Sequence, residues 1–290
     1  MADPISRALF LARRNLRNAL IRYRRLTPGR LIRDAMRARI LRERDIAPRA
    51  VTQRPERVVV GLTSIPERAA LLAPALRGLV DQTCPADRLV LCWPDMSLRT
   101  GKPYPAPPDV PSGVEILRCE DFGPATKLLP LLEAEPGAVV IAVDDDVIYP
   151  DDFIETLLEG HRQHPGAALG FRGWRLQPGL DPRDYDHVFG TALRSPADVD
   201  ILLGTWGYLI PPGALDAVVS EFSGWPEEVR WADDVWISGH LMRRGARRLA
   251  IPARGLPMET AASRVAALTD GINRSGHNDR TAIAAFEPWR

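Results

Sequence analysis

Three adjacent aspartates, Asp144, Asp145 and Asp146, are the most distinctive chemical cluster in this sequence of 290 residues. They directly follow the apolar run 138–143, so they stand where a buried strand is expected to end. Neighbouring carboxylates repel one another, and carboxylate oxygens are the ligands that Mg²⁺ and Mn²⁺ prefer. The alternative is a solvated acidic turn that caps a helix beginning near Pro150. Because a cap needs only one carboxylate, a site for a divalent metal is the favoured interpretation.

A second acidic pair, Asp233 and Asp234, stands at the start of a predicted helix that runs to Arg243. A carboxylate placed there could take the proton from an attacking hydroxyl, which is general-base chemistry. The alternative is a helix cap, in which one of the two carboxylates accepts bonds from first-turn amides. The pair alone favours the cap, whereas its combination with the triple aspartate favours a catalytic role.

A glycine-rich stretch lies between the two acidic clusters and contains Gly204, Trp206 and Gly207. Glycine lets a ligand approach the backbone closely, and an indole ring offers a flat face of the type that stacks on sugars. A tight turn would explain the glycines about as well.

The fold that positions these residues can be predicted from the pattern of apolar residues after residue 57. Short apolar runs rich in β-branched residues alternate with amphipathic helical stretches, which predicts an α/β fold with a mostly parallel central sheet flanked by helices. Ligands of such sheets bind at the carboxyl ends of the strands. The expected strands are 58–62, 89–92, 114–117, 138–143 and 167–171, the expected helices are 69–82 and 151–163, and 93–111, with six prolines, is expected to be a long surface loop.

The first 57 residues differ sharply in charge from the rest. They contain 16 arginines, no lysine and five acidic residues, a net charge of +11, which leaves −10 for the remainder. Residues 5–25 place apolar side chains at spacings of three and four, which predicts a basic amphipathic helix. Such a helix suits an anionic membrane surface, and the alternatives are docking on the protein's own acidic body or on a second subunit, or a transit peptide. Nucleic acid is not expected, because aromatic interleaving and known binding motifs are lacking.

Other sequence features bear on location. No stretch approaches the ~18 to 20 apolar residues that span a bilayer, and no signal-peptide core is recognisable. The three cysteines, Cys84, Cys92 and Cys119, form no C-x-x-C pair, which favours a reducing compartment. We therefore expect a cytoplasmic protein, with peripheral attachment to the inner face of the plasma membrane as the membrane alternative. The predicted division is a helical extension, 1–50, and one domain, 51–290.

The motifs in their order resemble bacterial glycosyltransferases with the GT-A fold, close to the family-two nucleotide-sugar transferases. The resemblance spans residues 57 to about 240 and depends on several modest motifs in the family's order rather than on any single one. The matching segments are GLTSIPER (61–68), LVDQT (79–83), GPATKL (123–128), DDDVIYP (144–150), the glycine-rich stretch at Gly204 and ADDVW (232–236).

The resemblance implies a role for each matching residue. Nucleotide contacts are implied for Thr63, Ser64, Pro66 and Arg68, and Lys127 is implied to face the base-ribose or diphosphate region. Asp144 and Asp146 match the outer positions of the D-x-D motif, where one carboxylate meets the ribose and the last binds Mn²⁺ or Mg²⁺, with Asp145 between them on the donor side. Donor contacts are further implied for the loop residues Gly204, Trp206 and Gly207.

The catalytic base is implied by the second cluster. Asp234 matches the base of inverting family members, and Asp233 stands beside it where the family also has an acid. Many GT-A enzymes add a late histidine to the metal, for which His277 is the candidate here, although a lone histidine is more often structural. The implied reaction is metal-dependent transfer of a sugar from a nucleotide-sugar donor to a hydroxyl of a glycan or glycolipid acceptor, with inversion, in surface polysaccharide or glycolipid assembly.

One departure from the family pattern is clear. The second expected strand ends in CWPD (92–95), whereas close family-two relatives carry an aspartate pair there that reads the nucleobase, so the nucleobase stays open. A retaining mechanism also stays open. The competing interpretations are a sugar-nucleotidyltransferase, which would need a glycine-rich basic loop that 62–68 does not provide, and a non-catalytic, membrane-associated carbohydrate-binding scaffold.

Overall fold

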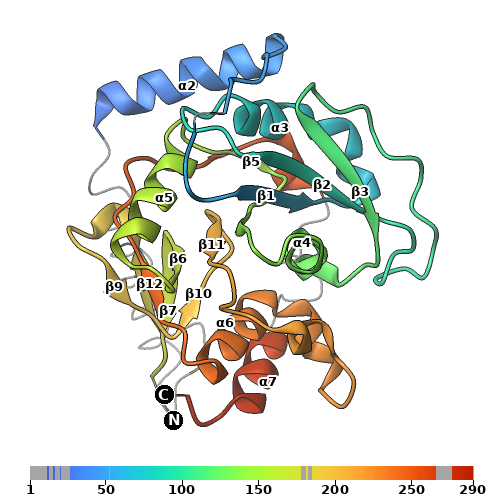
Figure 1. Cartoon of the computed structure of the whole chain (residues 1–290), viewed down its shortest axis with the longest axis vertical. Helices are drawn as coiled ribbons and strands as arrows, with labels where there is room; N and C mark the ends of the chain where they lie inside the picture. Colours follow the sequence, from blue (N-terminus) through green and yellow to red (C-terminus); the bar gives the residue numbers. More distant parts are fainter. Residues whose placement is uncertain are drawn as a thin grey trace.

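The computed structural model describes residues 12, 16, 20, 27–51, 53–177, 181, 185–265 and 276–289. Within these residues an eight-stranded sheet forms the centre of the molecule, in the order β3-β2-β1-β4-β11-β6-β12-β9 (Figure 1). The expected class, a mostly parallel α/β sheet flanked by helices, is confirmed. The strands of this sheet are β1 (Val58–Thr63), β2 (Arg88–Pro94), β3 (Val114–Cys119), β4 (Val139–Ala142), β6 (Ala168–Gly170), β9 (Ala197–Asp198), β11 (Tyr208–Ile210) and β12 (Arg248–Ala250).

The first half of the sheet is parallel. β1 pairs in parallel with β2 on one side and with β4 on the other, and β2 pairs in parallel with β3. The apolar β-branched runs explain this placement, because β1, β2 and β4 are buried almost throughout. We expected 114–117 to be buried as well, but β3 forms the sheet edge and alternates between exposed and half-buried side chains. Glu115, which interrupts this run, is exposed and pairs with Arg88, so the expectation of two-sided burial was wrong.

The second half of the sheet is mixed. β11 runs antiparallel to both β4 and β6, β12 runs parallel to β6, and β9 pairs antiparallel with β12. Two small sheets accompany it, β10-β7-β8 and β13-β5. Their strands are β10 (Ile201–Leu202), β7 (Arg172–Arg175), β8 (Asp186–Phe189), β13 (Met258–Glu259) and β5 (Val147–Ile148).

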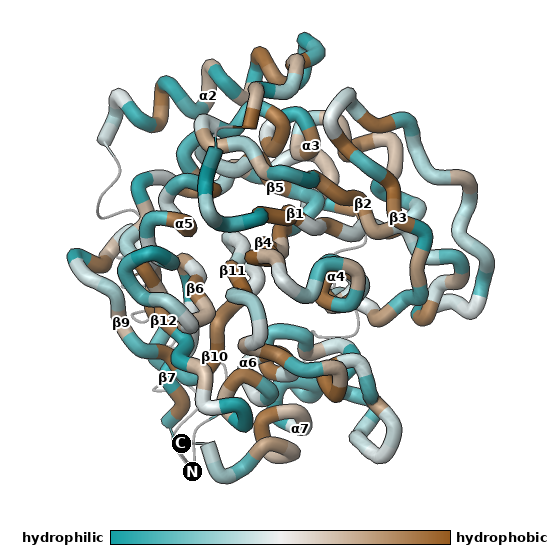
Figure 2. Tube along the Cα trace, in the orientation of Figure 1, coloured by the Kyte–Doolittle hydropathy of each residue, from teal (hydrophilic) through white to brown (hydrophobic). Residues whose placement is uncertain are grey.

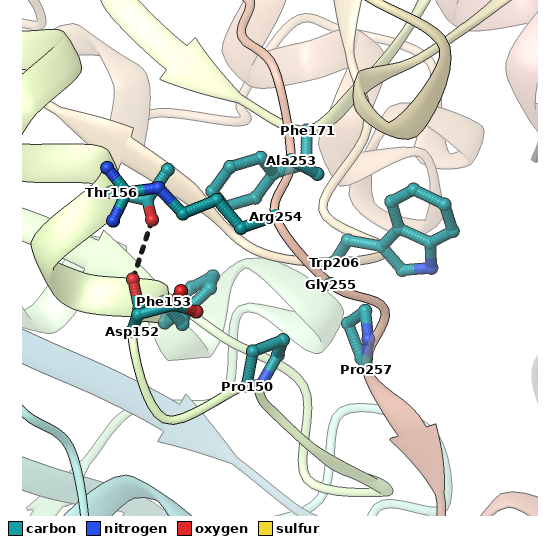
Figure 3. A pocket seen from close by; sticks show the side chains of 10 residues that line it. All are labelled: Pro150, Asp152, Phe153, Thr156, Phe171, Trp206, Ala253, Arg254, Gly255 and Pro257. Atoms are coloured by element: carbon teal, nitrogen blue, oxygen red, sulfur yellow. Dashed lines mark hydrogen bonds between the residues drawn. The ribbon is translucent and has the colours of Figure 1, made fainter. Parts of the chain in front are cut away.

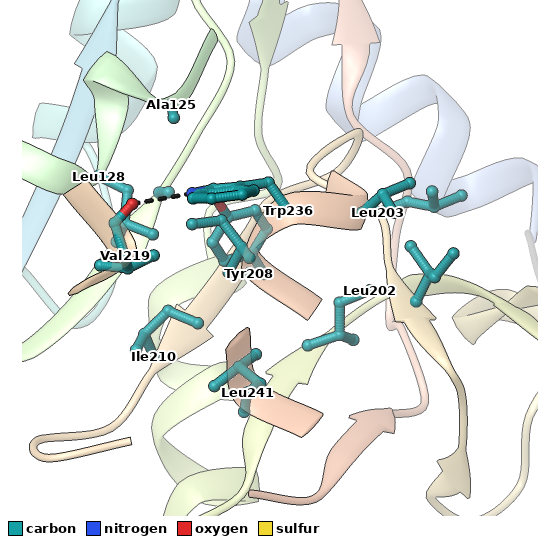
Figure 4. Close-up of a cluster of buried hydrophobic side chains, with 14 of the residues drawn as sticks. Ala125, Leu128, Leu202, Leu203, Tyr208, Ile210, Val219, Trp236 and Leu241 are labelled. Carbon is teal, nitrogen blue, oxygen red and sulfur yellow. Dashed lines mark hydrogen bonds between the residues drawn. The ribbon is translucent and has the colours of Figure 1, made fainter. Parts of the chain in front are cut away.

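Helices cover both faces of the sheet and enclose a separate core on each. α3 (Ala73–Val80) and α5 (Phe153–Gln163) contribute to one core, together with Val58, Val60 and Leu62 of β1. α4 (Leu129–Ala134), α6 (Asp233–Arg243) and α7 (His277–Ala285) contribute to the other, together with Val59 of the same strand. The alternation along β1 follows the two-residue period of a strand. Figure 4 shows the second core around Trp236, whose indole Nε1 donates to the Val219 carbonyl at 2.8 Å.

Short 3₁₀ helices lie in the segments between the strands and α-helices, and one of them, η1, replaces the first part of an expected α-helix. We expected a helix over 69–82; the chain instead forms a 3₁₀ helix, η1, and then α3, which carries a proline in its first turn. The helix expected over 151–163 is α5. The 3₁₀ helices are η1 (Pro66–Leu71), η2 (Gly123–Lys127), η4 (Gly190–Ala192), η5 (Ala217–Ser220), η6 (Glu227–Trp231) and η7 (Ala261–Arg264).

The segment expected to be a surface loop, 93–111, is partly built into the core. β2 continues to Pro94, and the Tyr104 ring is buried edge-on against Trp93, with ring centroids 5.2 Å apart. Trp93 also donates from Nε1 to the Pro105 carbonyl at 2.9 Å. These contacts hold the segment close to the carboxyl end of β1, where Tyr104 donates to the Ser64 carbonyl at 3.4 Å.

The N-terminal region contains a helix, α2 (Pro28–Glu43), that lies on the outside of α3 (Figure 1). The helix predicted over 5–25 lies outside the described residues, apart from residues 12, 16 and 20, and the predicted division at residue 50 stays a prediction. Among the helices of the described residues, none combines the length and the apolar character needed to cross a bilayer.

Candidate active site

The carboxyl ends of β1 and β4 lie side by side at a point where the strand order reverses. From β1 the chain moves outward to β2 and β3 and then returns to the other side of β1 to form β4. Open α/β sheets bind their ligands at such a switch point, outside the carboxyl ends of the strands. Thr63 is the last residue of β1, and Asp144 follows β4 by two residues. The fold therefore brings two of the predicted motifs together.

Asp145 joins these two strand ends. The Ser64 hydroxyl donates to its Oδ2, and Nη1 of Arg68 donates to its Oδ1 at 2.7 Å. Asp145 is buried, and burial raises the pKa of its carboxyl although Arg68 opposes that rise. These partners explain why three carboxylates tolerate one another here. The alternative that the triple aspartate caps the following helix is wrong, because α5 begins at Phe153 and no side chain caps its first turn.

Asp146 has a less complete set of partners. Its Oδ2 lies 3.2 Å from Nη1 of Arg68, the guanidinium that Asp145 also uses. Burial, followed by repulsion from Asp144 and Asp145, raises the pKa of the Asp146 carboxyl to about 6. The backbone is held firmly, since Thr260 donates to the Asp146 carbonyl from its amide at 2.8 Å and from its hydroxyl at 3.0 Å. This carboxylate is thus fixed in place and carries negative charge that one arginine does not fully offset.

Lys127 connects the two acidic clusters. Its Nζ donates to Oδ1 of Asp144 at 3.0 Å and lies 3.4 Å from Oδ2 of Asp233. Burial alone would lower the pKa of this lysine, but the carboxylates of Asp144 and Asp233 hold it well above its ordinary value. The structure therefore brings a carboxylate of each acidic cluster to one buried ammonium group.

Asp234 is held by a backbone amide of the glycine-rich stretch. Its Oδ1 accepts from the Gly204 amide at 2.6 Å, and α6, which begins at Asp233, has no side-chain cap. The helix-cap alternative for this pair is therefore wrong. Burial, followed by repulsion from Asp233, raises the pKa of the Asp234 carboxyl well above its ordinary value. A carboxylate with raised proton affinity is better suited to accept a proton from a hydroxyl.

Gly204 is required by space rather than by backbone conformation. A Cβ atom at this position would lie 2.8 Å from Oδ1 of Asp234 and 2.8 Å from Nζ of Lys127. Both distances are shorter than side chains tolerate, so only glycine allows the carboxylate and the ammonium to approach this closely. We expected the glycine to let a ligand approach the backbone. In the structure the side chains of Asp234 and Lys127 occupy the space next to Gly204.

Trp206 requires a correction. Its side chain was expected to offer a flat face to a sugar, but the residue is only 2% exposed. One face lies under the Arg172 guanidinium, 5.2 Å from the ring centroid, and Phe189 packs at 5.9 Å. Figure 3 shows the ring at a narrow hollow lined by Phe153, Phe171 and neighbouring residues. Its φ of 85° is unusual for a side-chain-bearing residue and turns the chain at this point, followed by Gly207, also at positive φ.

His277 also departs from its expected place. It begins α7, is exposed, and its Nε2 lies 3.1 Å from Oε1 of Glu228 in η6. In the part of the chain that the structure describes, no three histidine, cysteine or acidic side chains form a group able to hold a metal. Sequence reasoning assigned no role to a neighbour on the same helix: Asp279 is half-buried, and burial together with Asp233 raises its pKa to about 6. Its only sequence signal was its position two residues after the candidate histidine.

The remaining predicted donor residues lie at the end of β1. Thr63 donates from its hydroxyl to the Cys92 carbonyl at 2.9 Å, and Pro66 opens η1, the turn that carries Arg68. Arg68 also donates from Nε to the Val265 carbonyl at 2.9 Å, which ties this turn to the segment after η7. Asp95, which directly follows β2 in the CWPD segment, accepts from Nε of Arg118 at 2.7 Å.

The oxygen-rich donor set fits a hard divalent cation in one specific way. Asp144 and Asp146 supply carboxylate oxygens, and burial, followed by repulsion from the neighbouring aspartates, raises the pKa of Asp146, a rise that a bound cation would oppose. A complete cage of protein ligands is absent among the described residues, but Mg²⁺-type sites commonly use one or two carboxylates plus substrate phosphates. The residues present therefore fit a metal held jointly with a diphosphate, and His277 as a further ligand stays a prediction.

The chain has only low similarity to known proteins. No protein-family model matches the chain, and no curated protein matches it. Among solved structures it is similar to a mannosyltransferase from Pyrobaculum calidifontis in complex with GDP-Man and Mn²⁺, with 18% identity, a TM-score of 0.47 and coverage of 81% of this chain and 65% of that one. It is also similar to GalNAc-T7 with UDP, GalNAc and Mn²⁺, with 13% identity, a TM-score of 0.43 and coverage of 77% and 51%. The chain thus spans less than two thirds of either protein, and the assignment of function depends on its own residues.

Proposed function

We propose that this chain is a metal-dependent glycosyltransferase of the GT-A type, which moves a sugar from a nucleotide-sugar donor to a hydroxyl acceptor. One observation carries the proposal: at the switch point of the sheet, Lys127 lies between Asp144 and Asp233, so the two predicted acidic motifs meet at one site. A reaction that separates a diphosphate leaving group from a sugar needs cationic groups for the leaving group and a base for the attacking oxygen.

The donor side of the site is built from the ends of β1 and β4. Asp146 and Asp144 would hold Mn²⁺ or Mg²⁺, which supplies Lewis-acid stabilisation of the leaving diphosphate when bound. Arg68 and Lys127 carry the fixed positive charge next to these carboxylates. When a donor enters, both side chains can exchange a carboxylate for a phosphate oxygen. Thr63, Ser64 and Pro66 form the adjoining wall toward the nucleotide.

The acceptor side is built from the start of α6. Asp234 would take the proton from the attacking hydroxyl, and its hydrogen bond from the Gly204 amide orients the carboxylate. Asp233 places negative charge beside Asp234, which favours protonation of Asp234 as the reaction proceeds. A base in this position corresponds to one in-line displacement with inversion. The acceptor we propose is a glycan or glycolipid hydroxyl in surface polysaccharide or glycolipid assembly.

A screen of donors tests the function directly. The purified chain is incubated with UDP-, GDP- and CMP-sugars, with Mn²⁺ or with a chelator, and the released nucleotide is measured. We expect release from one nucleotide class only, dependent on the metal and stimulated by an acceptor. Pyrophosphate release from a nucleoside triphosphate and a sugar phosphate would instead indicate a nucleotidyltransferase. Sugar binding without any turnover would indicate the carbohydrate-binding scaffold.

A further inference from the structure

Helix α2 packs on the protein through both polar and apolar side chains and turns a row of apolar side chains outward. Ala38 and Leu41 are buried on the inner side against Ile148, Asp34 is buried there too, and Arg30 and Arg37 are half-buried. The outer side carries three exposed large apolar residues, of which Ile32 is 61% and Met36 63% exposed. The solvent-facing side of a surface helix ordinarily carries charged and polar residues instead.

Ion pairs and hydrogen bonds fix the helix in this orientation. Nη2 of Arg30 lies 2.9 Å from Oδ1 of Asp152 at the start of α5. Arg37 donates from Nε to Oδ2 of Asp81 at 2.9 Å and from Nη1 to the Tyr149 carbonyl at 2.6 Å. A rotation that buried the apolar row would break all of these contacts. The outward apolar row is therefore a consequence of specific bonding on the inner side.

The exposed row is continuous along the helix. Ile32, Met36 and Ile40 follow one another at a spacing of four residues, so they line one side of α2. Ile40 is 44% exposed. Figure 1 shows α2 as the outermost element of this part of the molecule, lying over α3. Contiguous exposed apolar residues on one surface mark a site of interaction.

The charge around the row identifies the partner. Arg33, Arg42 and Arg44 are exposed on the same helix or at its end, in a region of the chain with a net charge of +11, while the exposed Arg39 pairs with Glu43. Two copies packed face to face would bring these arginines together, which is unfavourable. Nucleic acid would attract the arginines but offers nothing to Ile32 and Met36. An anionic bilayer surface satisfies both, with acyl chains for the apolar row and headgroups for the arginines.

We propose that the outward face of α2 is a docking surface for anionic lipid membranes, with Ile32, Met36 and Ile40 entering the headgroup region and the flanking arginines binding lipid phosphates. This surface is separate from the predicted helix at 5–25 and does not depend on the proposed transfer reaction. Leu16 and Leu20, which the structure describes as exposed, are compatible with a lipid contact that extends beyond α2.

Co-sedimentation of the full chain with vesicles tests the docking surface. Vesicles of phosphatidylcholine alone are compared with vesicles containing about one third phosphatidylglycerol. The variant Ile32→Ser/Met36→Ser/Ile40→Ser removes the row, and because these side chains are exposed it should fold normally. The matched control, Met96→Ser/Leu98→Ser/Val218→Ser, removes three exposed apolar side chains from the body. We expect the row variant to bind anionic vesicles about tenfold more weakly or worse, and the control to bind as the unaltered chain does.

A polarity-sensitive dye gives a second readout that does not depend on how much the rest of the N-terminus contributes. It is attached at Met36→Cys, or at Met96→Cys as the control, with Cys84 and Cys119 replaced by serine. The account predicts a blue shift on anionic vesicles at position 36 and none at position 96. Failure of the full chain to bind anionic vesicles, an unshifted dye at position 36, or equal binding of row variant and control would each overturn the proposal. Conversion of a dimer to a monomer by the row variant, measured by sedimentation velocity, would show instead that a second copy covers the row.

Discussion

The two acidic clusters of the site are held in different ways. Asp144, Asp145 and Asp146 follow a buried strand, so the order of parallel strands determines where they lie. Asp233 and Asp234 arrive on α6, whose place is set by side-chain packing around Trp236. The first cluster thus depends on backbone pairing, whereas the second depends on close contacts between side chains and one loop.

The difference shows most clearly at the contacts of each cluster. Ser64 and Arg68, both from the turn after β1, bind Asp145 directly, and they would keep it in place if nearby packing changed. Asp234 has one backbone donor, the Gly204 amide, and that donor is usable only because residue 204 lacks a side chain. We therefore expect the strand-end cluster to tolerate change and the helix-start cluster to be sensitive to displacements of a few tenths of an ångström.

The largest expected effect comes from Asp234→Asn. Asparagine keeps an Oδ1 that can accept from the Gly204 amide, but it removes the basic oxygen. We expect sugar transfer to fall by roughly two or more orders of magnitude, with donor binding and thermal stability close to those of the unaltered chain. Initial rates with saturating donor and acceptor measure the change.

The matched variant Asp233→Asn distinguishes the two neighbours. It weakens the contact with Lys127 but leaves the Gly204 bond intact, so its effect on transfer should be much smaller. If transfer survives in Asp234→Asn and disappears in Asp233→Asn, the base is Asp233. Normal transfer in both variants would mean that no base of an inverting mechanism lies in this cluster.

A smaller effect, on stability, is expected from Gly204→Ala. The added Cβ would lie 2.8 Å from both Asp234 and Lys127, so the site must shift to accommodate it. Overpacking of this kind typically lowers the free energy of unfolding by about 1–3 kcal/mol. Gly137→Ala is the control, because no atom lies within 4 Å of the position that a Cβ would take there and its φ is not positive. Equal thermal unfolding of the two variants would contradict the sensitivity ascribed to the helix-start cluster.

The smallest effect is expected from Asp279→Asn and depends on pH. Burial and the nearby Asp233 raise the pKa of the Asp279 carboxyl from 3.8 to about 6 in the folded chain. Between these values the unfolded chain has released the proton and the folded chain still holds it, so stability falls as pH rises through this window. Asparagine does not titrate, and the variant should be more stable than the unaltered chain by about 1–2 kcal/mol above pH ~6.

Thermal unfolding of both proteins between pH ~4 and ~8 measures this difference. The gap should close toward the acidic end, where Asp279 is protonated in both the folded and the unfolded chain. A constant gap across the range would show that the carboxyl of Asp279 titrates normally and does not lie against Asp233.

Much of the first cluster could be predicted from the sequence, because its causes are local. Runs such as 138–143 predict buried strands, and the ends of parallel strands meet at one edge, so the nearness of the triple aspartate to the turn after β1 follows from the pattern. The edge position of β3 did not follow, since an apolar run does not reveal whether a further strand pairs beside it. The bonding of Asp145 by Arg68 also required the structure, because it depends on the course of η1.

The second cluster and the N-terminal helix could be predicted only in part. The start of α6 was recognisable, but its acids bind Gly204 and Lys127 instead of capping the helix, because tertiary contacts replaced the local ones. Trp206 was expected to face a ligand, and the positive φ at that position directs it inward instead. α2 shows the same limit, since the bonds of Arg30 and Arg37 to distant residues decide which side faces the protein.

The central claim is that Asp146 and Asp144 bind a nucleotide diphosphate through a divalent metal, and titration calorimetry with UDP and GDP tests it most directly. Each nucleotide is titrated into the unaltered chain, into Asp146→Ala and into the control Asp198→Ala. The control removes an exposed carboxylate of the edge strand β9 that pairs with Arg247. The account predicts that one nucleotide binds the unaltered chain and Asp198→Ala only when Mn²⁺ is present, and that this binding is lost in Asp146→Ala. Equal affinity in Asp146→Ala, or binding that persists in a chelator, would contradict the account.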